Sequence, residues 1–179
     1  MRIVLGVKQS LGARKTTVYN ALETMAVSLR PYRAEDQSFL FHLYASTRLH
    51  EIAAFGWPEA QQQAFLRMQF NARQQWYETS YSHAQHQVIE QNGTPIGRLM
   101  VLREASSSSL IDIALLPEYR GQGIGGDLIR ELIRQCGEGK VPLRLQVLRN
   151  NPARRLYERL GFVQTGEDQM YIQMERPPA

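Results

Sequence analysis

Three glycines, at positions 121, 123 and 125, close an apolar segment and mark the stretch of this 179-residue chain that is richest in chemical information. Glycine allows the backbone to approach a ligand closely, and successive N–H groups can turn to one side. The residues from Ile124 onward follow helical spacing, so the positive N-terminal end of a helix would lie beside those N–H groups. The pattern predicts a phosphate-binding loop between a strand and a helix.

Two common kinds of phosphate loop fit this segment poorly. A Walker loop needs Lys-Ser or Lys-Thr after its last glycine, whereas Gly126 and Asp127 stand there. The dinucleotide fingerprint G-x-G-x-x-G is satisfied by Gly121, Gly123 and Gly126. However, the next predicted strand, 141–147, lacks the acidic residue at its end that would bind a ribose. An oxidoreductase with a dinucleotide cofactor is therefore a distant alternative.

A third kind of loop fits better. Arg120–Gly125 resembles the pyrophosphate loop of the GNAT superfamily of N-acetyltransferases, Q/R-x-x-G-x-G/A, and residues 113–119 resemble the family's fourth strand and the turn after it. Residues 151–162, NPARRLYERLGF, resemble the second hallmark of the family. The detailed resemblance covers residues 108–165, and a looser one extends back to about residue 27.

The resemblance implies an α/β domain with the GNAT fold, in which a six- or seven-stranded, mostly antiparallel sheet carries a parallel fourth and fifth strand that splay apart, with about four helices. Acetyl-CoA would lie in that opening, without a metal. Its pantetheine arm would pair with the backbone of Ile113 and Leu115. Its pyrophosphate would rest on the loop residues Arg120, Gly121, Gln122, Gly123, Ile124 and Gly125. The motif asparagine is Asn150 when counted back from Tyr157, and Asn151 when counted forward from Val147.

The same resemblance implies an acyltransferase that moves an acetyl group from acetyl-CoA to a primary amine by direct attack. Tyr157 occupies the general-acid position and would protonate the leaving thiolate. Some members carry a catalytic Glu on the fifth strand, but Gln146 stands there and cannot accept a proton. The base is left open among Asp112, Glu104, Glu51 and ordered water. The missing Glu keeps a second interpretation, a catalytically inactive CoA-binding regulatory module.

The acceptor in this superfamily generally meets the loop between the first two helices. Glu51, Phe55 and Trp57 fall there, and an aromatic pair with a carboxylate suits an amine-bearing small molecule or a peptide. The same residues could instead hold the two helices together through apolar contacts.

The periodicity of the remaining residues supports a mixed α/β domain. After the glycine loop, Ile124, Leu128, Leu132 and Cys136 share one helical face, and a strand follows over 141–147. This β-α-β unit predicts a parallel strand pair. Upstream, the patterns predict a strand over 27–31, a helix over 34–46, and a helix from Pro58 with an inward stripe of Phe65, Met68, Ala72 and Trp76. Asn92-Gly93 predicts a hairpin, and Ser106 to Ser109 predict a further turn.

Composition limits the partners and the compartment. No apolar run approaches the roughly 20 residues of a membrane span, and the single cysteine fits a reducing compartment. Most of the net charge of +4 belongs to residues 1–24, so the remainder is nearly neutral and nucleic acid is not an expected partner. His83 and His86 lack further ligands and are interpreted as surface histidines. We expect a soluble cytoplasmic protein, which could dimerise through the strands 163–165 and 169–175.

Residues 1–24 differ from the rest of the chain in being basic and almost free of acids. They could be a targeting or interaction arm. Alternatively, Met25 is the true initiator, which we favour. The sequence thus predicts a disordered or mis-started N-terminal extension over 1–24 and, from the resemblance, one GNAT-like N-acetyltransferase domain over 25–179.

Overall fold

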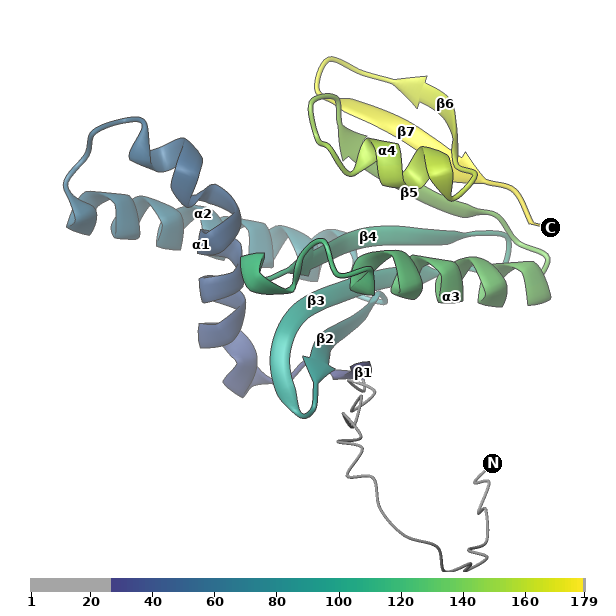
Figure 1. Ribbon diagram of the computed structural model, residues 1–179, viewed down its shortest axis with the longest axis horizontal. Coiled ribbons are helices and arrows are strands. Elements are labelled where there is room, and N and C mark those ends of the chain that lie inside the picture. The colour runs from purple at the N-terminus through teal and green to yellow at the C-terminus, as the bar shows by residue number, and fades with distance from the viewer. Residues whose placement is uncertain (1–26, 179) are drawn as a thin grey trace, which may run out of the picture.

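The computed structural model describes residues 27–178, so the predicted extension over residues 1–24 lies outside the described part. A single seven-stranded sheet has the order β1-β2-β3-β4-β5-β7-β6, and helices cover it on both sides (Figure 1). The strands are β1 (Val27–Pro31), β2 (Gln85–Gln91), β3 (Thr94–Arg103), β4 (Ser108–Leu115), β5 (Leu143–Leu148), β6 (Val163–Glu167) and β7 (Tyr171–Arg176). The α-helices are α1 (Gln37–Ala53), α2 (Glu59–Ser80), α3 (Ile124–Glu138) and α4 (Arg154–Arg159), with short 3-10 helices η1 (Ala34–Asp36) and η2 (Pro117–Tyr119).

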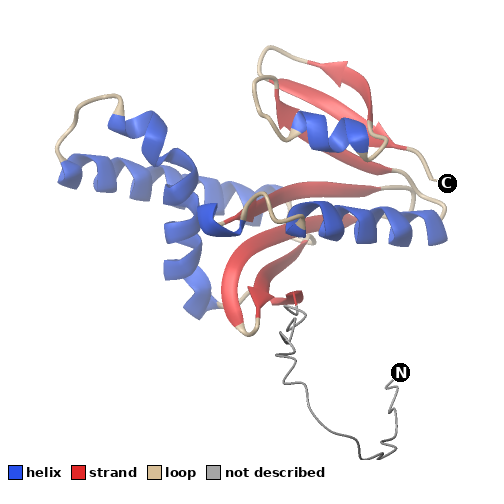
Figure 2. Cartoon of the chain, viewed as in Figure 1, coloured by secondary structure: helices blue, strands red, loops and turns tan. Residues whose placement is uncertain are grey.

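The order of the elements confirms the predicted fold class, a mixed α/β sheet of the GNAT type. All neighbouring strands are antiparallel except β4 and β5, which are parallel. Asn92 and Gly93 both have positive φ in the β2–β3 turn, as the hairpin signal requires. In Figure 2, α3 and α4 lie in front of the sheet and α2 passes behind it.

The main core lies between the sheet and the helices α3 and α4. Ile129, Leu132 and Cys136 of α3 are buried in one apolar cluster with residues of β3, β4, β5 and β7. The burial of Cys136 agrees with its predicted place on the apolar face of this helix. A smaller cluster joins Leu40 and Leu43 of α1 to Phe70 of α2 and Leu116. None of the helices in the described part is both long and apolar enough for a membrane span.

The strands β4 and β5 are paired over a short distance only. Their register runs through Ser108–Leu143, Ser109–Arg144 and Leu110–Leu145, and it ends there. Beyond Leu110, β4 continues beside β3 alone, and β5 continues beside β7 alone. The sheet therefore opens between Ile111–Leu115 on one side and Gln146–Leu148 on the other, as the resemblance implied.

The inward stripe predicted for the second helix is wrong. Met68 and Trp76 are 59% and 51% exposed, whereas Leu66, Phe70 and Tyr77 are buried. Both sets have helical spacing. The buried face also carries Arg73, and this charged residue concealed the apolar pattern of that face in the sequence. Pro58 is the cap that precedes α2 rather than part of its first turn.

Several predicted boundaries shift. The first helix continues to Ala53 because Ile52 is buried on the same face, so Glu51 lies in α1 and not in a loop. β5 begins at Leu143, and the turn expected over 106–109 ends earlier because Ser108 and Ser109 pair with β5. His86 is not a surface histidine, because its ring stacks on Tyr32 with centroids 4.4 Å apart and its Nε2 is buried.

Candidate active site

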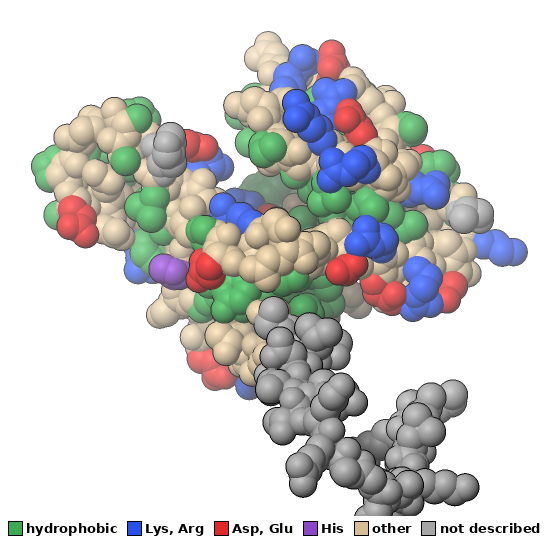
Figure 3. Space-filling view, in the orientation of Figure 1, with side chains coloured by type: hydrophobic (Ala, Val, Ile, Leu, Met, Phe, Trp, Pro, Cys, Tyr) green, Lys and Arg blue, Asp and Glu red, His purple; other side chains and the backbone are tan. Residues whose placement is uncertain are grey.

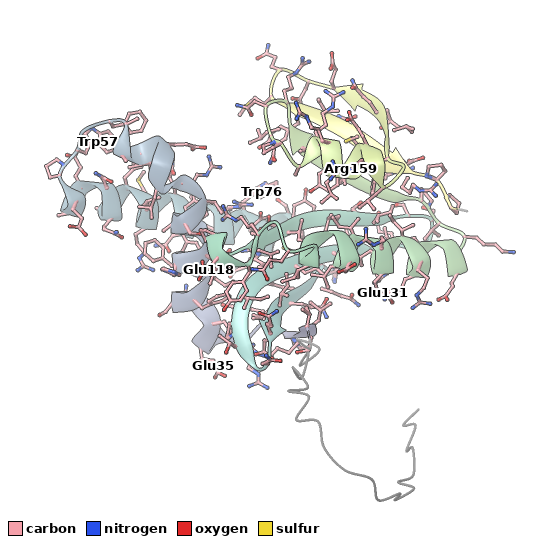
Figure 4. The ribbon with its side chains drawn as sticks, in the orientation of Figure 1. Glu35, Trp57, Trp76, Glu118, Glu131 and Arg159 are labelled. Carbon is pink, nitrogen blue, oxygen red and sulfur yellow. The ribbon has the colours of Figure 1, made fainter. Side chains whose placement is uncertain are left out.

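The opening between β4 and β5 forms the floor of a cleft of about 1120 Å³. Figure 3 shows this hollow between the arm made of α1 and α2 and the part of the molecule made of β5, α4, β6 and β7. Trp76, labelled in Figure 4, lies beside it. The lining residues from the opening itself include Ile111, Asp112, Ile113, Gln146, Val147, Asn151 and Tyr157.

The backbone of β4 presents unpaired groups to the opening. The Leu116 N–H donates to the Ile96 carbonyl at 2.9 Å, so Leu116 faces β3 with its N–H. Successive residues of a strand direct their backbone groups to opposite sides. The backbone N–H and C=O groups of Ile113 and Leu115 therefore point away from β3 and toward the opening. The Leu115 carbonyl accepts a hydrogen bond from Arg120 Nε at 2.8 Å. No other strand of the described chain pairs with this edge of β4 at Ile113 or Leu115, and Ile113 lines the cleft.

The glycine loop joins this edge to the N-terminus of α3. Gly121 and Gly123 have φ values of 72° and 87°, and a Cβ at Gly121 would meet nothing within 4 Å. Gly123 is the N-cap of α3, and no side chain caps the helix, so its first N–H groups remain free for a ligand. Arg120 and Gln122 hold the loop in shape through their bonds to the Leu115 and Glu118 carbonyls. The loop can therefore bind an anion through its backbone.

Tyr157 stands on α4 at the edge of the cleft and is 8% exposed. Its ring packs edge-on against Phe162, with centroids 5.8 Å apart. Burial raises the pKa of Tyr157 to about 12, and the Asp112 carboxylate adds to the rise. The phenol consequently keeps its proton throughout the neutral range, as a proton donor must.

The two asparagines at the start of the α4 segment occupy different environments. Asn151 lines the cleft, and its Oδ1 accepts a hydrogen bond from the Ala153 N–H at 2.9 Å. Asn150 is exposed and is not part of the cleft wall. Of the two, Asn151 is better placed to meet a ligand in the opening.

A group of charged side chains that the sequence interpretation did not single out lies on the floor of the cleft. Asp112 of β4 forms ion pairs with Arg73 of α2 through Oδ1 and with Arg98 of β3 through Oδ2, both at 3.2 Å. Arg73 Nε also donates to the Tyr77 hydroxyl at 2.7 Å, and the Arg98 guanidinium lies 4.4 Å from the centroid of the Tyr77 ring. Burial lowers the pKa of Arg98. This network fixes α2 against the sheet beside the opening.

Comparison with known proteins agrees with this geometry. Residues 82–164 match the sequence profile of the acetyltransferase (GNAT) domain. This part of the chain is similar to a GNAT acetyltransferase domain. The matched residues include the β4–α3 loop, the opening and Tyr157.

Two relatives share sequence with this chain. A putative [ribosomal protein bS18]-alanine N-acetyltransferase of Bacillus subtilis is 34% identical over 87 residues, which are 48% of this chain and 56% of that protein. The [ribosomal protein bS18]-alanine N-acetyltransferase of Haemophilus influenzae is 40% identical over 73 residues, which are 40% of this chain and 50% of that protein. The chain thus spans about half the length of these relatives.

Solved structures share the GNAT fold over most of the chain. The PaiA N-acetyltransferase of Thermoplasma acidophilum, crystallised with coenzyme A, has a TM-score of 0.64 at 21% identity and covers 86% of this chain and 99% of its own. The ribosomal-protein-S18-alanine N-acetyltransferase of Escherichia coli has a TM-score of 0.59 at 21% identity and covers 86% of this chain and 95% of its own. At these identities the likeness concerns the fold.

The candidates for a base separate in space. Both Asp112 oxygens are already held by guanidinium groups. Glu104 accepts a hydrogen bond from Ser107 and does not line the cleft. Glu51 lines it and pairs with Arg48 at 2.9 Å. Gln146 also lines it but is an amide. Of the three carboxylates, Glu51 alone faces the cleft without being held by two arginines.

The predicted acceptor residues do not act together. Glu51 lines the cleft, whereas Phe55 and Trp57 do not. Phe55 packs on Trp57 with centroids 5.1 Å apart, and Trp57 packs edge-on against Phe65 of α2 at 5.3 Å. The two aromatic residues therefore join α1 to α2, in agreement with the alternative stated for them. Within residues 27–178, no three His, Cys, Asp or Glu side chains gather as a metal site would require.

The residues that the sequence interpretation missed are Arg73, Arg98 and the aromatic side chains Trp76, Tyr77 and Tyr81 of the cleft wall. Arg98 did leave a signal, because it interrupts the apolar run of β3 from Ile96 to Val101. A charged residue within a buried strand needs a partner of opposite charge. Asp112, an acidic residue within the apolar strand β4, is the partner that this rule predicts for Arg98.

Proposed function

We propose that this protein is an N-acetyltransferase that moves an acetyl group from acetyl-CoA to a primary amine. The observation that carries the proposal is the junction of three features: the unpaired edge of β4, the glycine loop at the start of α3, and the protonated Tyr157 in one cleft. The two sequence relatives are N-acetyltransferases by name, which supports the reaction type. The structure neighbour from Thermoplasma acidophilum was crystallised with coenzyme A, which supports the cosubstrate.

The residues of the cleft suit acetyl-CoA chemically. An extended pantetheine arm carries amide groups that can pair with the backbone of Ile113 and Leu115, as a peptide does at a sheet edge. A pyrophosphate can accept hydrogen bonds from the free N–H groups of Gly123, Ile124 and Gly125 at the positive end of α3. We assign Arg120, Gly121 and Gln122 to shaping this loop, and Asn151 rather than Asn150 to contact with the arm.

The reaction then needs few groups from the protein. The neutral amine attacks the thioester carbonyl carbon, and a C–N bond forms while the carbonyl electrons move to oxygen. As the C–S bond breaks, the leaving sulfur takes the phenolic proton of Tyr157. The nitrogen loses a proton to water in the open cleft or to Glu51, and the tyrosinate recovers a proton from solvent. The products are the acetylated amine and free CoA thiol.

An inactive CoA-binding module remains the alternative because Gln146 cannot act as a base. The names of the two relatives favour the enzyme, and Tyr157 in the cleft wall offers the proton donor that the reaction needs. The names of the two relatives suggest the N-terminal alanine of a ribosomal protein as one class of acceptor to test.

Calorimetric titration tests the proposal directly. Acetyl-CoA is titrated into the protein, into Gly123→Asp and into Gly56→Asp, with NADH as a control ligand. Gly123→Asp should abolish binding, because aspartate is strained at φ 87° and would place a carboxylate against the pyrophosphate. Gly56 has a similar φ of 65° with open space around it, and it lies in the α1–α2 loop far from the glycine loop (Figure 1). Gly56→Asp should therefore bind normally.

Binding of acetyl-CoA by the protein and by Gly56→Asp but not by Gly123→Asp would support the proposed site. Equal binding by all three proteins would place acetyl-CoA elsewhere. No binding at all would overturn the proposed function, and binding of NADH in its place would restore the dinucleotide interpretation. Release of free thiol in the presence of an amine then separates an enzyme from a module that only binds.

A further inference from the structure

The charges that line the cleft do not balance. Four arginines and three carboxylates face it, and two of the arginines have a carboxylate each: Arg48 pairs with Glu51 at 2.9 Å, and Arg144 pairs with Glu175 at 2.7 Å. The third carboxylate, Asp112, is shared by Arg73 and Arg98. Among the residues that the structure describes, the floor of the cleft therefore carries one positive charge in excess.

Two of the three side chains of this group are largely shielded from water, whereas the Arg73 side chain is 34% exposed. The Arg98 side chain is 5% exposed, and the Asp112 side chain is 15% exposed. A buried charge is costly unless an opposite charge and hydrogen bonds compensate for it. One carboxylate compensates for only one of the two guanidinium groups, so this part of the cleft favours the arrival of an anion.

The hydrogen bonds of Arg98 also indicate that this part of the cleft lacks acceptors. A guanidinium has five N–H donors. Arg98 Nη1 donates to the amide oxygen of Gln74 at 2.9 Å, and Nη2 has only the thioether sulfur of Met100 at 3.7 Å, which is a weak acceptor. Its buried Nε has no well-aligned hydrogen bond, although Asp112 Oδ2 lies at 3.2 Å. A group nine-tenths buried in the cleft wall is thus short of acceptors.

The position of this group relates it to the reaction. Asp112 neighbours Ile113, whose backbone faces the opening, and its charge is close enough to contribute to the raised pKa of Tyr157. An anion bound by Arg73 and Arg98 would consequently sit near the end of the cleft where an acyl group and its acceptor meet. The aromatic side chains Trp76, Tyr77 and Tyr81 line the same wall.

We propose that Arg73 and Arg98 form an oxyanion subsite, and that the acceptor is a small molecule with a carboxylate or phosphate close to its primary amine. This inference rests on the proposed function and names the acceptor class of that site. A guanidinium pair binds such groups through charge-assisted hydrogen bonds, which are stronger than neutral ones. A bound oxyanion would supply the charge and the acceptors that the cleft floor lacks.

Matched amines with and without the anion test the inference by calorimetry. Phenylalanine is compared with phenethylamine, and phosphoethanolamine with ethanolamine, on the free protein and on the protein saturated with CoA. A hexapeptide that begins with alanine, has an amidated C-terminus and contains no acidic residue represents a peptide acceptor. We expect at least one anionic member to bind roughly tenfold more tightly than its partner, as one charge-assisted contact would give. The pair that shows the difference identifies carboxylate or phosphate.

Three variants separate recognition from support of the fold. Arg73→Gln removes the less buried guanidinium and should abolish the preference for the anionic member. Asp112→Asn removes the competing carboxylate and should increase the preference for the anionic member. If Asp112 had only a structural role, this variant would instead weaken the binding of all ligands alike. Arg144→Gln is the matched control, because Arg144 also lines the cleft but is compensated by Glu175. It should leave the preference unchanged. Thermal unfolding of each variant verifies that it is folded.

The outcomes are distinct from those of the proposed function. If acetyl-CoA binds but every pair and the peptide bind without regard to the anion, the oxyanion subsite is overturned and the acetyltransferase stands. Tighter binding of the amidated peptide than of any anionic amine also overturns it. If acetyl-CoA fails to bind, the function is overturned, while the titrations of the free protein still decide whether the anion site exists.

Discussion

At the scale of single residues, the phenol of Tyr157 is the group whose removal separates binding from chemistry. We predict that Tyr157→Phe lowers kcat by about a hundredfold, the lower range of general-acid contributions. The affinity for acetyl-CoA should stay nearly constant, because the ring keeps its contact with Phe162. Stopped-assay thiol release and calorimetry measure the two quantities. Tyr119→Phe makes the same chemical change outside the cleft wall and should have no effect on kcat.

An unchanged kcat in Tyr157→Phe would show that the thiolate leaves without help from this residue. A parallel loss of acetyl-CoA affinity would instead assign Tyr157 to binding.

His86 supplies a prediction about stability in acid. Burial, together with the charge of Arg98, lowers its pKa to about 4. The unfolded chain takes up a proton as the pH falls through about 6.5, whereas the folded protein takes it up only near pH 4. The contribution of this group to stability is therefore complete above pH 6.5 and is lost between pH 6.5 and pH 4.

We accordingly expect His86→Phe, which can keep the stacking on Tyr32, to lose less unfolding free energy than the natural protein when the pH falls from 7 to 4. Urea unfolding at several pH values measures the difference. His83→Gln alters an exposed histidine and should follow the natural protein. Parallel pH profiles for His86→Phe and the natural protein would contradict the assignment.

The residue scale also shows how far the sequence could lead. The glycine loop, Tyr157 and the pair Asn150 and Asn151 could be located because they belong to contiguous motifs, whereas the fold was needed to show that Asn151 lines the cleft. The Arg73–Asp112–Arg98 network could not, since its members come from α2, β4 and β3 and meet only when the sheet is assembled. The isolated charges within β3 and β4 were the available signal, and the pairing itself required the fold.

At the scale of elements, the register of β3 against β4 depends on a glycine that the sequence did not mark. Gly97 lies opposite Leu115, and a Cβ there would come within 2.4 Å of the Ala114 carbonyl oxygen and 2.7 Å of Leu115 Cδ2. No side chain fits without moving β4, whose other edge is the proposed cosubstrate edge.

We predict that Gly97→Ala lowers the unfolding free energy by about 1–3 kcal/mol, as overpacking does, and weakens acetyl-CoA binding. Gly137→Ala is the control, because it lies in α3 with nothing within 4 Å of its Cβ position. It should be neutral or stabilise by up to about 1 kcal/mol, as alanine favours a helix. Denaturant unfolding and calorimetry measure both effects. A fully stable Gly97→Ala with normal affinity would mean that β4 can shift at no cost.

The elements explain which predictions from the sequence succeeded. Strong periodicity and turn residues located α3, the β2–β3 hairpin and the parallel pairing of β4 with β5. The α2 stripe was wrong because that helix carries apolar residues on two faces, and periodicity cannot tell which face meets the sheet. The face of α2 that meets the sheet includes Arg73, which shares the Asp112 carboxylate with Arg98.

At the scale of the whole molecule, the sheet consists of two parts that share little backbone pairing. Three residue pairs join β4 to β5, while the apolar cluster beneath α3 extends across both parts. The opening can therefore exist without dividing the core. A ligand that pairs with the free edge of β4 would supply, in the opening, the hydrogen bonds that β5 does not make.

Hydrogen exchange should detect this pairing one residue at a time. We predict that saturation with acetyl-CoA slows exchange at the amides of Ile113 and Leu115, which face the opening. The amide of Leu116 should change little, because it already donates to Ile96. At a hundredfold excess over Kd the ligand adds about 2.7 kcal/mol to the unfolding free energy, which corresponds to a rise in Tm of roughly 5–10 °C. Gly123→Asp should lose both effects. A rise in Tm without the alternation between neighbouring amides would show that acetyl-CoA binds the loop but does not pair with β4.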